Sequence, residues 1–225
     1  MLFKTRAKND LKHTDKAIMR TNNEDFKTKL YLAIESIEKN SSVEIVAMIK
    51  PQSDKYKDIS FASGIIILFL TYSFFIYSPT VYNDYLIYFT TIFSFFITYG
   101  IVDFITPLKR LLLSKKRKKK NVEIYARAYF QKAKIRHTTE KTGILIYISI
   151  LEKETFIIAD KEVEISIPSE EWDRLNNNFN NIFTQKDFYS KIIENLNNCL
   201  TIFSEYIPSK EDDINELPDN MDIDL

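Results

Sequence analysis

Two long uncharged segments dominate the pattern of hydrophobic and polar positions along the chain. The first runs from Ile59 to Asn83, and the second runs from Tyr85 to Val102 after a single Asp84. A helix needs roughly 20 apolar residues to cross the hydrocarbon core of a bilayer. Neither segment has the polar stripe of a helix on the surface of a soluble protein. The pattern therefore predicts a hairpin of two transmembrane helices, at residues 59–78 and 85–105, rather than a buried core hairpin.

The residues on either side of this hairpin show the shorter periods of a soluble α/β domain. Before it, the pattern predicts a helix beginning near Glu24 and a strand at Val43–Ile49. After it, a helix is expected from Val122 to about Ile135, and strands are expected at Ile144–Ile150 and Thr155–Asp160. Two further helices are expected, one that Ser169 caps and one that Thr184 caps and Pro208 ends.

The strand before the hairpin needs the strands after it. A lone strand cannot cover its apolar faces or its backbone groups, so we expect all of them in one small mixed sheet with flanking helices. The fold class is then α/β, interrupted by the two-helix transmembrane hairpin. The expected segments are a basic N-terminal segment (1–22), the first part of the α/β domain (23–57), the two spans (59–78 and 85–105), a basic juxtamembrane segment (109–120), the second part of the domain (121–207) and an acidic tail (208–225).

The distribution of charge predicts an orientation for the hairpin. The chain has no net charge, but Lys50, Lys55 and Lys57 precede the first span and a basic block follows the second. This basic block consists of Lys115, Lys116, Arg117, Lys118, Lys119 and Lys120. Cytoplasmic flanks carry the excess of Lys and Arg, so we expect both termini in the cytoplasm. The basic block should contact anionic lipid headgroups, and we do not expect it to bind nucleic acid.

Two single residues receive structural interpretations. Asp103 lies near the inner end of the second span, within reach of Lys109 or Arg110, and is interpreted as interfacial. Cys199 is the one cysteine, so no internal disulfide can form, and its place on an apolar helix stripe predicts a core position.

The order of the elements resembles a known family, the TPM domain. Ala33–Glu38 followed by Asn40–Ile45 resembles the opening of that domain, and Thr142–Ser149 resembles its central strand. Glu154–Asp160 resembles the strand paired with it, and Trp172 follows at a fitting distance. A tail at Asn215–Asp219, an apolar hairpin and a basic stretch after it resemble a bacterial membrane-bound subgroup of the family.

The chain departs from the family pattern at two places, Val43 and Lys161–Val163, where the family often has glycine. The resemblance implies a TPM-like fold and a place in a bacterial inner (cell) membrane. It also implies two kinds of activity, because some family members are described as acid phosphatases and others as repair or assembly factors for membrane proteins.

A phosphatase of this kind needs a metal or positive charge to stabilise the charge that develops on the phosphate. Asp54 and Asp58 follow the first strand, and Asp160 follows the third. If they met at one edge of the sheet, their oxygens could hold Ca²⁺ or Mg²⁺. The alternative is that they are solvated loop carboxylates. Glu44, inside the first strand, is a further candidate, with a solvent-side or ion-pairing role as its alternative.

No catalytic constellation stands out in the sequence, so whether the protein is an enzyme stays open at this point. The first hypothesis is an interaction, assembly or repair factor that binds another membrane protein. The alternative is a metal-dependent, acid-type phosphatase acting at the membrane surface. A channel-like oligomer is disfavoured, because the spans carry few polar groups.

Overall fold

The computed structural model describes residues 24–133, 135, 140–184, 187–210 and 222–223. A helix at residues 24–40 opens this part of the chain. The later elements are β1 (Glu44–Lys50), α2 (Lys57–Tyr77), α3 (Asp84–Phe104), α4 (Thr106–Leu112), α5 (Lys115–Lys132), β2 (Gly143–Ser149), β3 (Glu154–Ala159), α6 (Lys161–Ser166), α7 (Ser169–Asn180), the 3₁₀ turn η2 (Asn181–Thr184), α8 (Phe188–Tyr206) and β4 (Asp222–Ile223).

The sheet is mixed and has the strand order β3-β2-β1-β4. β1 lies parallel to β2, with Glu44 opposite Gly143 and Lys50 opposite Ser149. β3 returns antiparallel to β2, and the short β4 lies parallel to β1. The prediction that the strand before the hairpin joins the strands after it is therefore confirmed, as is the mixed α/β fold class.

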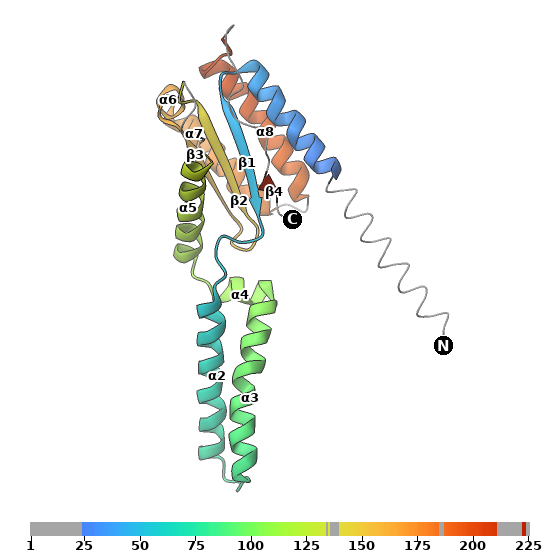
Figure 1. Ribbon diagram of the computed structural model, residues 1–225, viewed down its shortest axis with the longest axis vertical. Helices are drawn as coiled ribbons and strands as arrows, with labels where there is room; N and C mark the ends of the chain where they lie inside the picture. Colours follow the sequence, from blue (N-terminus) through green and yellow to red (C-terminus); the bar gives the residue numbers. More distant parts are fainter. Residues whose placement is uncertain (1–23, 134, 136–139, 185–186, 211–221, 224–225) are drawn as a thin grey trace, which may run out of the picture.

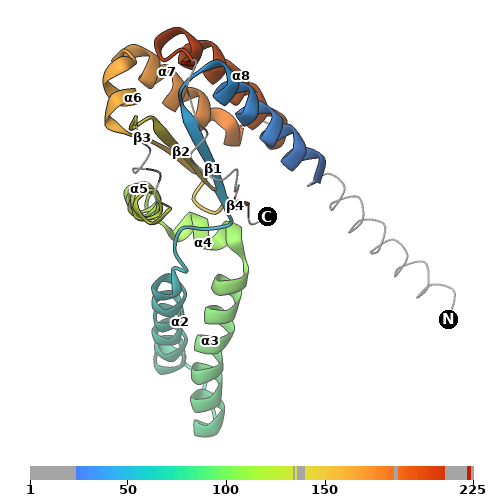
Figure 2. The same ribbon diagram turned by 45° about the horizontal axis from the view of Figure 1, so that its top comes forward.

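Helices cover both faces of this sheet (Figure 2). Residues 24–40, α6, α7 and α8 pack on one face, where Ile45, Ala47 and Ile49 of β1 belong to the same cluster as Leu196 of α8. α5 packs on the other face against Val46 and Met48 of β1. Because its side chains are buried on alternate faces, β1 is a covered central strand, as its apolar sequence predicted.

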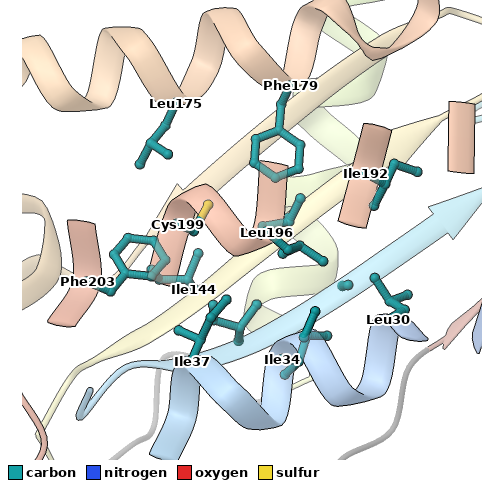
Figure 3. Close-up of a cluster of buried hydrophobic side chains, with 14 of the residues drawn as sticks. Leu30, Ile34, Ile37, Ile144, Leu175, Phe179, Ile192, Leu196, Cys199 and Phe203 are labelled. Carbon is teal, nitrogen blue, oxygen red and sulfur yellow. The ribbon is translucent and has the colours of Figure 1, made fainter. Parts of the chain in front are cut away.

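The larger core cluster is built largely from the helices that the apolar periodicity predicted. Figure 3 shows Leu30, Ile34 and Ile37 of the first helix opposite side chains of α7 and α8. Cys199 lies among them and is 1% exposed, so its predicted core position is confirmed. Burial raises the pKa of its thiol to about 12, which makes it a weak nucleophile.

The helices α2 and α3 form an antiparallel pair that projects from one end of the α/β unit (Figure 1). Each has 21 residues and is long and apolar enough to cross a membrane. Only 11% and 6% of their most apolar windows are buried, whereas the core helix of a soluble protein would be mostly buried. Gly64 is a point of close packing between them, because a Cβ there would lie 2.7 Å from the Phe95 ring.

Helix boundaries differ from the sequence predictions where a polar cap decides them. α5 begins at Lys115 instead of Val122, because the Ser114 hydroxyl oxygen accepts a hydrogen bond from the Arg117 N–H. α8 begins after Asp187, which caps it in place of the predicted Thr184. Ser169 is already helical in α7 and does not cap it.

Four elements were not predicted: α4, α6, η2 and β4. α4 contains a proline in its first turn, where the missing N–H costs no helical hydrogen bond. α6 follows Asp160, whose side chain accepts a hydrogen bond from the Lys161 N–H. Asp222–Ile223, within the expected acidic tail, form β4 beside β1.

Candidate functional site

Polar side chains gather at the carboxyl ends of the parallel strands β1 and β2. In α/β sheets this end is where ligand and functional sites usually lie. Lys50 and Ser149 end the two strands opposite each other, so the segments after them meet. In Figure 1 this end of the sheet faces α4 and the helical hairpin.

The centre of this region is the carboxylate of Glu152, which is 2% exposed. Its Oε1 accepts hydrogen bonds from the Tyr56 hydroxyl at 2.7 Å and from the Ser53 N–H at 3.0 Å. Its Oε2 accepts a hydrogen bond from the Ser149 hydroxyl. A buried charge is costly unless it is hydrogen-bonded, and here both oxygens have donors.

The hydrogen bonds extend to a second tyrosine. The Ser53 hydroxyl donates to Ser149 Oγ at 3.0 Å and lies 2.9 Å from the Tyr147 hydroxyl. We call these five residues, Ser53, Tyr56, Tyr147, Ser149 and Glu152, the Glu152 network. Burial raises the pKa of Tyr147 to about 12, and burial together with the hydrogen bond to Glu152 raises the pKa of Tyr56. Both phenols therefore stay protonated at neutral pH.

Tyr56 also sets where the first helix of the hairpin begins. It precedes α2 with a left-handed backbone (φ 49°, ψ 34°), a conformation that costs a residue with a side chain about 1–2 kcal/mol. Its ring is 1% exposed, packs against Leu113 and Leu151, and lies 5.4 Å from the Arg117 guanidinium. The network thus holds a strained residue in place at the start of α2.

A second set of contacts ties α4 to the same region. Lys109 is 5% exposed, and its ammonium lies 2.9 Å from Asp103 Oδ1 and 3.4 Å from the Lys55 carbonyl oxygen. Arg110 donates to the Leu151 carbonyl oxygen at 2.6 Å and to that of Ile150 at 3.2 Å. The prediction that Asp103 lies within reach of Lys109 is confirmed. These contacts fix both ends of the hairpin against the turn between β2 and β3.

The structure separates the three carboxylates of the predicted metal site. Asp58 forms two hydrogen bonds with Arg117, at 2.6 and 2.9 Å, and Asp54 accepts one from Asn121 at 3.1 Å. Asp160 lies at the other end of the sheet, because β3 runs back along β2 and places Ala159 opposite Ile144. A strand of this length spans about 20 Å.

The prediction that Asp54, Asp58 and Asp160 converge at one edge is therefore wrong. Within the described residues, no group of three His, Cys, Asp or Glu side chains could hold a metal ion. Glu44 lies at the start of β1, again at the end away from the Glu152 network. It is 8% exposed, so it is not a solvent-side residue.

The basic block forms the first turns of α5. Lys115, Lys116, Lys119 and Lys120 are exposed, while Lys118 is half-buried and Arg117 pairs with Asp58. Cations at the beginning of a helix oppose its dipole and repel one another. The positive charges in the first turns of α5 thus destabilise the isolated helix. An anionic partner would weaken their mutual repulsion.

Chemically, the Glu152 network is a structural clamp with its hydrogen-bonding groups satisfied. Its hydroxyls donate to a carboxylate or to one another, and none is activated by a histidine or a cysteine among the described residues. The network was not predicted, because Glu152 lies in a short polar segment between two strands. The one available signal was Tyr147 and Ser149 within an otherwise aliphatic strand.

Comparisons with known proteins bear on the fold and the domain. The TPM domain family matches residues 110–198, a stretch from α4 into α8 that includes β2 and β3 but not β1. No curated protein matches the chain. Among solved structures, the chain is similar to the NMR structure of the BA42 protein from the psychrophilic bacterium Bizionia argentinensis.

The similarity to BA42 covers 88% of this chain and 91% of that protein, with a TM-score of 0.53 and 19% sequence identity. At that identity the likeness shows the fold alone. The chain is thus similar to the TPM domain over residues 110–198, and it has a fold known from a bacterial protein.

Proposed function

We propose that this protein is an integral protein of a bacterial inner membrane whose cytosolic TPM-like domain binds other membrane proteins, as an interaction, assembly or repair factor. The helices α2 and α3 are its anchor in the bilayer. The hairpin, the basic stretch and the tail resemble those of the bacterial membrane-bound TPM subgroup, which supports this location.

The exposure of α2 and α3 supports the membrane anchor. Large side chains on them remain open in the structure, among them Phe69, Phe74 and Phe96, each more than 60% exposed. An apolar surface of this extent would be unfavourable in water. Lys and Arg flank the hairpin at its domain end, and the loop at residues 78–83 has none, so both termini are cytoplasmic.

The observation that carries the proposal is the clamp between the hairpin and the sheet. The Glu152 network, Lys109 and Arg110 together join α2, α4 and the β2–β3 turn through buried and partly buried hydrogen bonds. Such a junction restrains the orientation of the domain relative to the bilayer. A fixed orientation serves a domain that must present a surface to neighbours in the same membrane.

The basic block adds an electrostatic contribution in this arrangement. It follows α4 directly, so Lys115, Lys116, Lys119 and Lys120 would lie at headgroup level. Each cation near an anionic surface contributes about 1 kcal/mol. Anionic lipid would also relieve the repulsion within the first turns of α5.

Cysteine labelling in cells tests the location. In a Cys199→Ser background, Thr28→Cys and Glu194→Cys should be protected from a membrane-impermeant maleimide, and Thr80→Cys should react. Both domain positions are exposed in the structure. Labelling of Thr28→Cys and Glu194→Cys from opposite sides of the membrane would overturn the topology.

Two further measurements separate the binding role from the phosphatase alternative. Photo-reactive residues on the exposed surface of the domain should give adducts with the same membrane protein in repeated preparations, and headgroup contacts alone should not produce them. Purified full-length chain should not hydrolyse phosphate esters with Ca²⁺ or Mg²⁺. Robust turnover that Asp54→Asn and Asp58→Asn abolish would overturn the proposal in favour of an enzyme.

A further inference from the structure

The strand β3 forms one edge of the sheet, and its outer side is not protected. The order β3-β2-β1-β4 leaves β3 paired only with β2. Edge strands are usually blocked by charged side chains, proline or a bulge. After Glu154 at its start, β3 has no charge and no proline, and its pairing with β2 runs without interruption.

The register defines which backbone groups point outward. The Asp160 N–H donates to the Gly143 carbonyl oxygen at 2.8 Å, so this N–H points toward β2, while the Asp160 carbonyl oxygen accepts from the Glu164 N–H of α6. Successive residues of an antiparallel strand alternate in the direction of their backbone groups. Thr155, Ile157 and Ala159 therefore direct theirs to the open side, and within the described residues those backbone groups have no hydrogen-bond partner.

A groove runs along this edge. A cavity of about 480 Å³ lies between α5 and α7, lined by Phe156–Ala159, Arg127 and Trp172 among others. A second cavity of about 260 Å³, reaching Asp160, shares Arg127, Ile158, Ala159 and Glu164 with the first, so the two adjoin. We call their combined lining the β3 groove. Figure 2 shows β3 at the side of the sheet where α5 and α6 lie.

The groove holds two buried polar atoms without a partner. Trp172 lines the larger cavity, and its buried indole N–H has no acceptor. Asp160 is 7% exposed, and its Oδ2 has no donor although its Oδ1 accepts from the Lys161 N–H. Buried polar groups are rarely left unpaired in native proteins, so the groove lacks an acceptor near Trp172 and a donor near Asp160.

The charges of the groove favour a basic occupant on one side. Glu164 and Asp173 are exposed on α6 and α7, and Asp160 lines the smaller cavity together with Glu164 and the exposed Lys161. On the other side, Arg127 already pairs with Glu123 at 3.0 Å and lies over the Phe156 ring. An extended segment directs alternate side chains to the two sides of a sheet. Cationic side chains would then face α6 and α7, and apolar ones would face α5.

We propose that the β3 groove binds an extended, basic-and-apolar segment of a partner protein as an additional strand of the sheet. The partner's backbone pairs with the outward groups of Ile157 and Ala159. Its carbonyl oxygen satisfies the Trp172 indole, and a Lys or Arg satisfies Asp160. This inference rests on the proposed function, since it names the manner in which the domain binds its partner.

Peptide titration tests the proposal on the full-length chain in nanodiscs. The probe is the peptide Ac-Lys-Val-Lys-Val-Lys-Val-NH₂, and fluorescence of Trp172, the only tryptophan, is the readout. A saturable change is expected. A peptide with proline in place of the central valine should bind about tenfold more weakly, because it loses backbone hydrogen bonds. No saturation up to about 1 mM would overturn the proposal.

A charge reversal gives a sharper test, because both residues it changes are exposed and the fold should not depend on them. The variant Glu164→Lys/Asp173→Lys should bind the lysine peptide about fivefold more weakly and should prefer the corresponding glutamate peptide. The control Glu162→Lys/Glu170→Lys makes the same change in net charge at exposed positions that do not line the groove. Equal effects of the two variants would overturn the proposal.

Other occupants give distinct outcomes. If a second copy covers the edge, Ile157→Pro will dissociate a dimer, and if the chain's own basic segment covers it, binding will begin only after deletion of residues 1–23. Either result would overturn the proposal that a separate partner protein binds the β3 groove. If the peptide does not bind but photo-adducts with a membrane protein persist on other faces, the groove assignment fails and the proposed function stands.

Discussion

Replacement of Glu152 by alanine should be among the most destabilising single changes at the junction. The carboxylate is buried and accepts from Tyr56, Ser53 and Ser149. Its removal leaves three donors without an acceptor, each costing about 1–3 kcal/mol where water cannot reach them. Since hydroxyls can rotate toward other acceptors, we expect a total loss of about 3–5 kcal/mol. This is a large part of the 5–15 kcal/mol by which domains are usually stable.

Glu152→Gln separates the carboxylate charge from the hydrogen bonds. The amide oxygen can still accept from Tyr56 and Ser53, and the amide nitrogen can donate to Ser149 Oγ if that hydroxyl turns. Charge-assisted hydrogen bonds are roughly twice as strong as neutral ones, so this variant should lose only about 1 kcal/mol. Glu123→Ala is the matched control, because Glu123 makes an exposed ion pair with Arg127 and its loss should cost less than about 0.5 kcal/mol.

Urea unfolding of the full-length chain in nanodiscs, followed by Trp172 fluorescence, measures these differences. Trp172 packs at the margin of the core of the α/β unit and reports its unfolding. In a double-mutant cycle, Glu152→Ala and Tyr56→Phe should couple by about 1–2 kcal/mol. Glu152→Ala leaves the Tyr56 hydroxyl without an acceptor, and Tyr56→Phe removes that hydroxyl. A loss below about 1 kcal/mol in Glu152→Ala, with no coupling to Tyr56, would refute the buried clamp.

Three further predictions concern the hairpin and its junction. Asp103→Ala should destabilise the chain by about 2 kcal/mol in thermal unfolding, because it leaves the buried Lys109 ammonium without its carboxylate. Adding Lys109→Met should restore most of the lost stability. An unchanged midpoint in Asp103→Ala would contradict this prediction. Gly64→Leu should separate α2 from α3 and lower the midpoint, whereas Gly100→Leu, where nothing lies within 4 Å of a new Cβ, should not. Burial raises the pKa of Tyr147 to about 12 from an ordinary value of 10.0. The contribution of the protonated phenol to the free energy of unfolding is therefore complete below pH 10. It is lost as the pH rises toward 12, and this loss amounts to up to about 2 kcal/mol. Tyr147→Phe should therefore show a shallower loss of unfolding free energy over that interval, and an identical pH profile would show that the phenol ionises as readily in the folded state as in the unfolded state.

The hydrophobic periodicity predicted the strands and helices in which many successive residues are apolar. The strand Val43–Ile49 and the strand Ile144–Ile150 were placed within one residue of β1 and β2, because continuous β-branched runs are typical of covered strands. The two apolar helices were found for the same reason. The beginning of α5 was missed, because the first turns of this helix consist of like charges that no short-range preference would assemble into a helix.

The candidate site could not be predicted, because its contacts are long-range. Ser53 and Tyr56 reach Glu152 across 99 and 96 positions of sequence. The register of β1 with β2 brings these positions together, and no local pattern encodes a register. The metal-site prediction failed for the same reason, because it also depended on how the strands pair. It assumed that the residue after a third strand lies beside the residues after the first, although a short β2–β3 connection reverses the strand and carries Asp160 to the opposite end.

Because β3 returns antiparallel to β2, the two ends of the sheet carry different groups of polar residues. The carboxyl ends of β1 and β2 are occupied by the clamp, whose buried donors and acceptors are used in holding the hairpin. Asp160, carried away from that end, lies instead in the β3 groove with an oxygen that has no partner. In a free-standing α/β domain the carboxyl ends of the parallel strands are open for ligands. Here the connection to the apolar hairpin fills them, so we expect a binding surface elsewhere, and at the edge of β3 the described residues leave backbone and side-chain polar groups without partners.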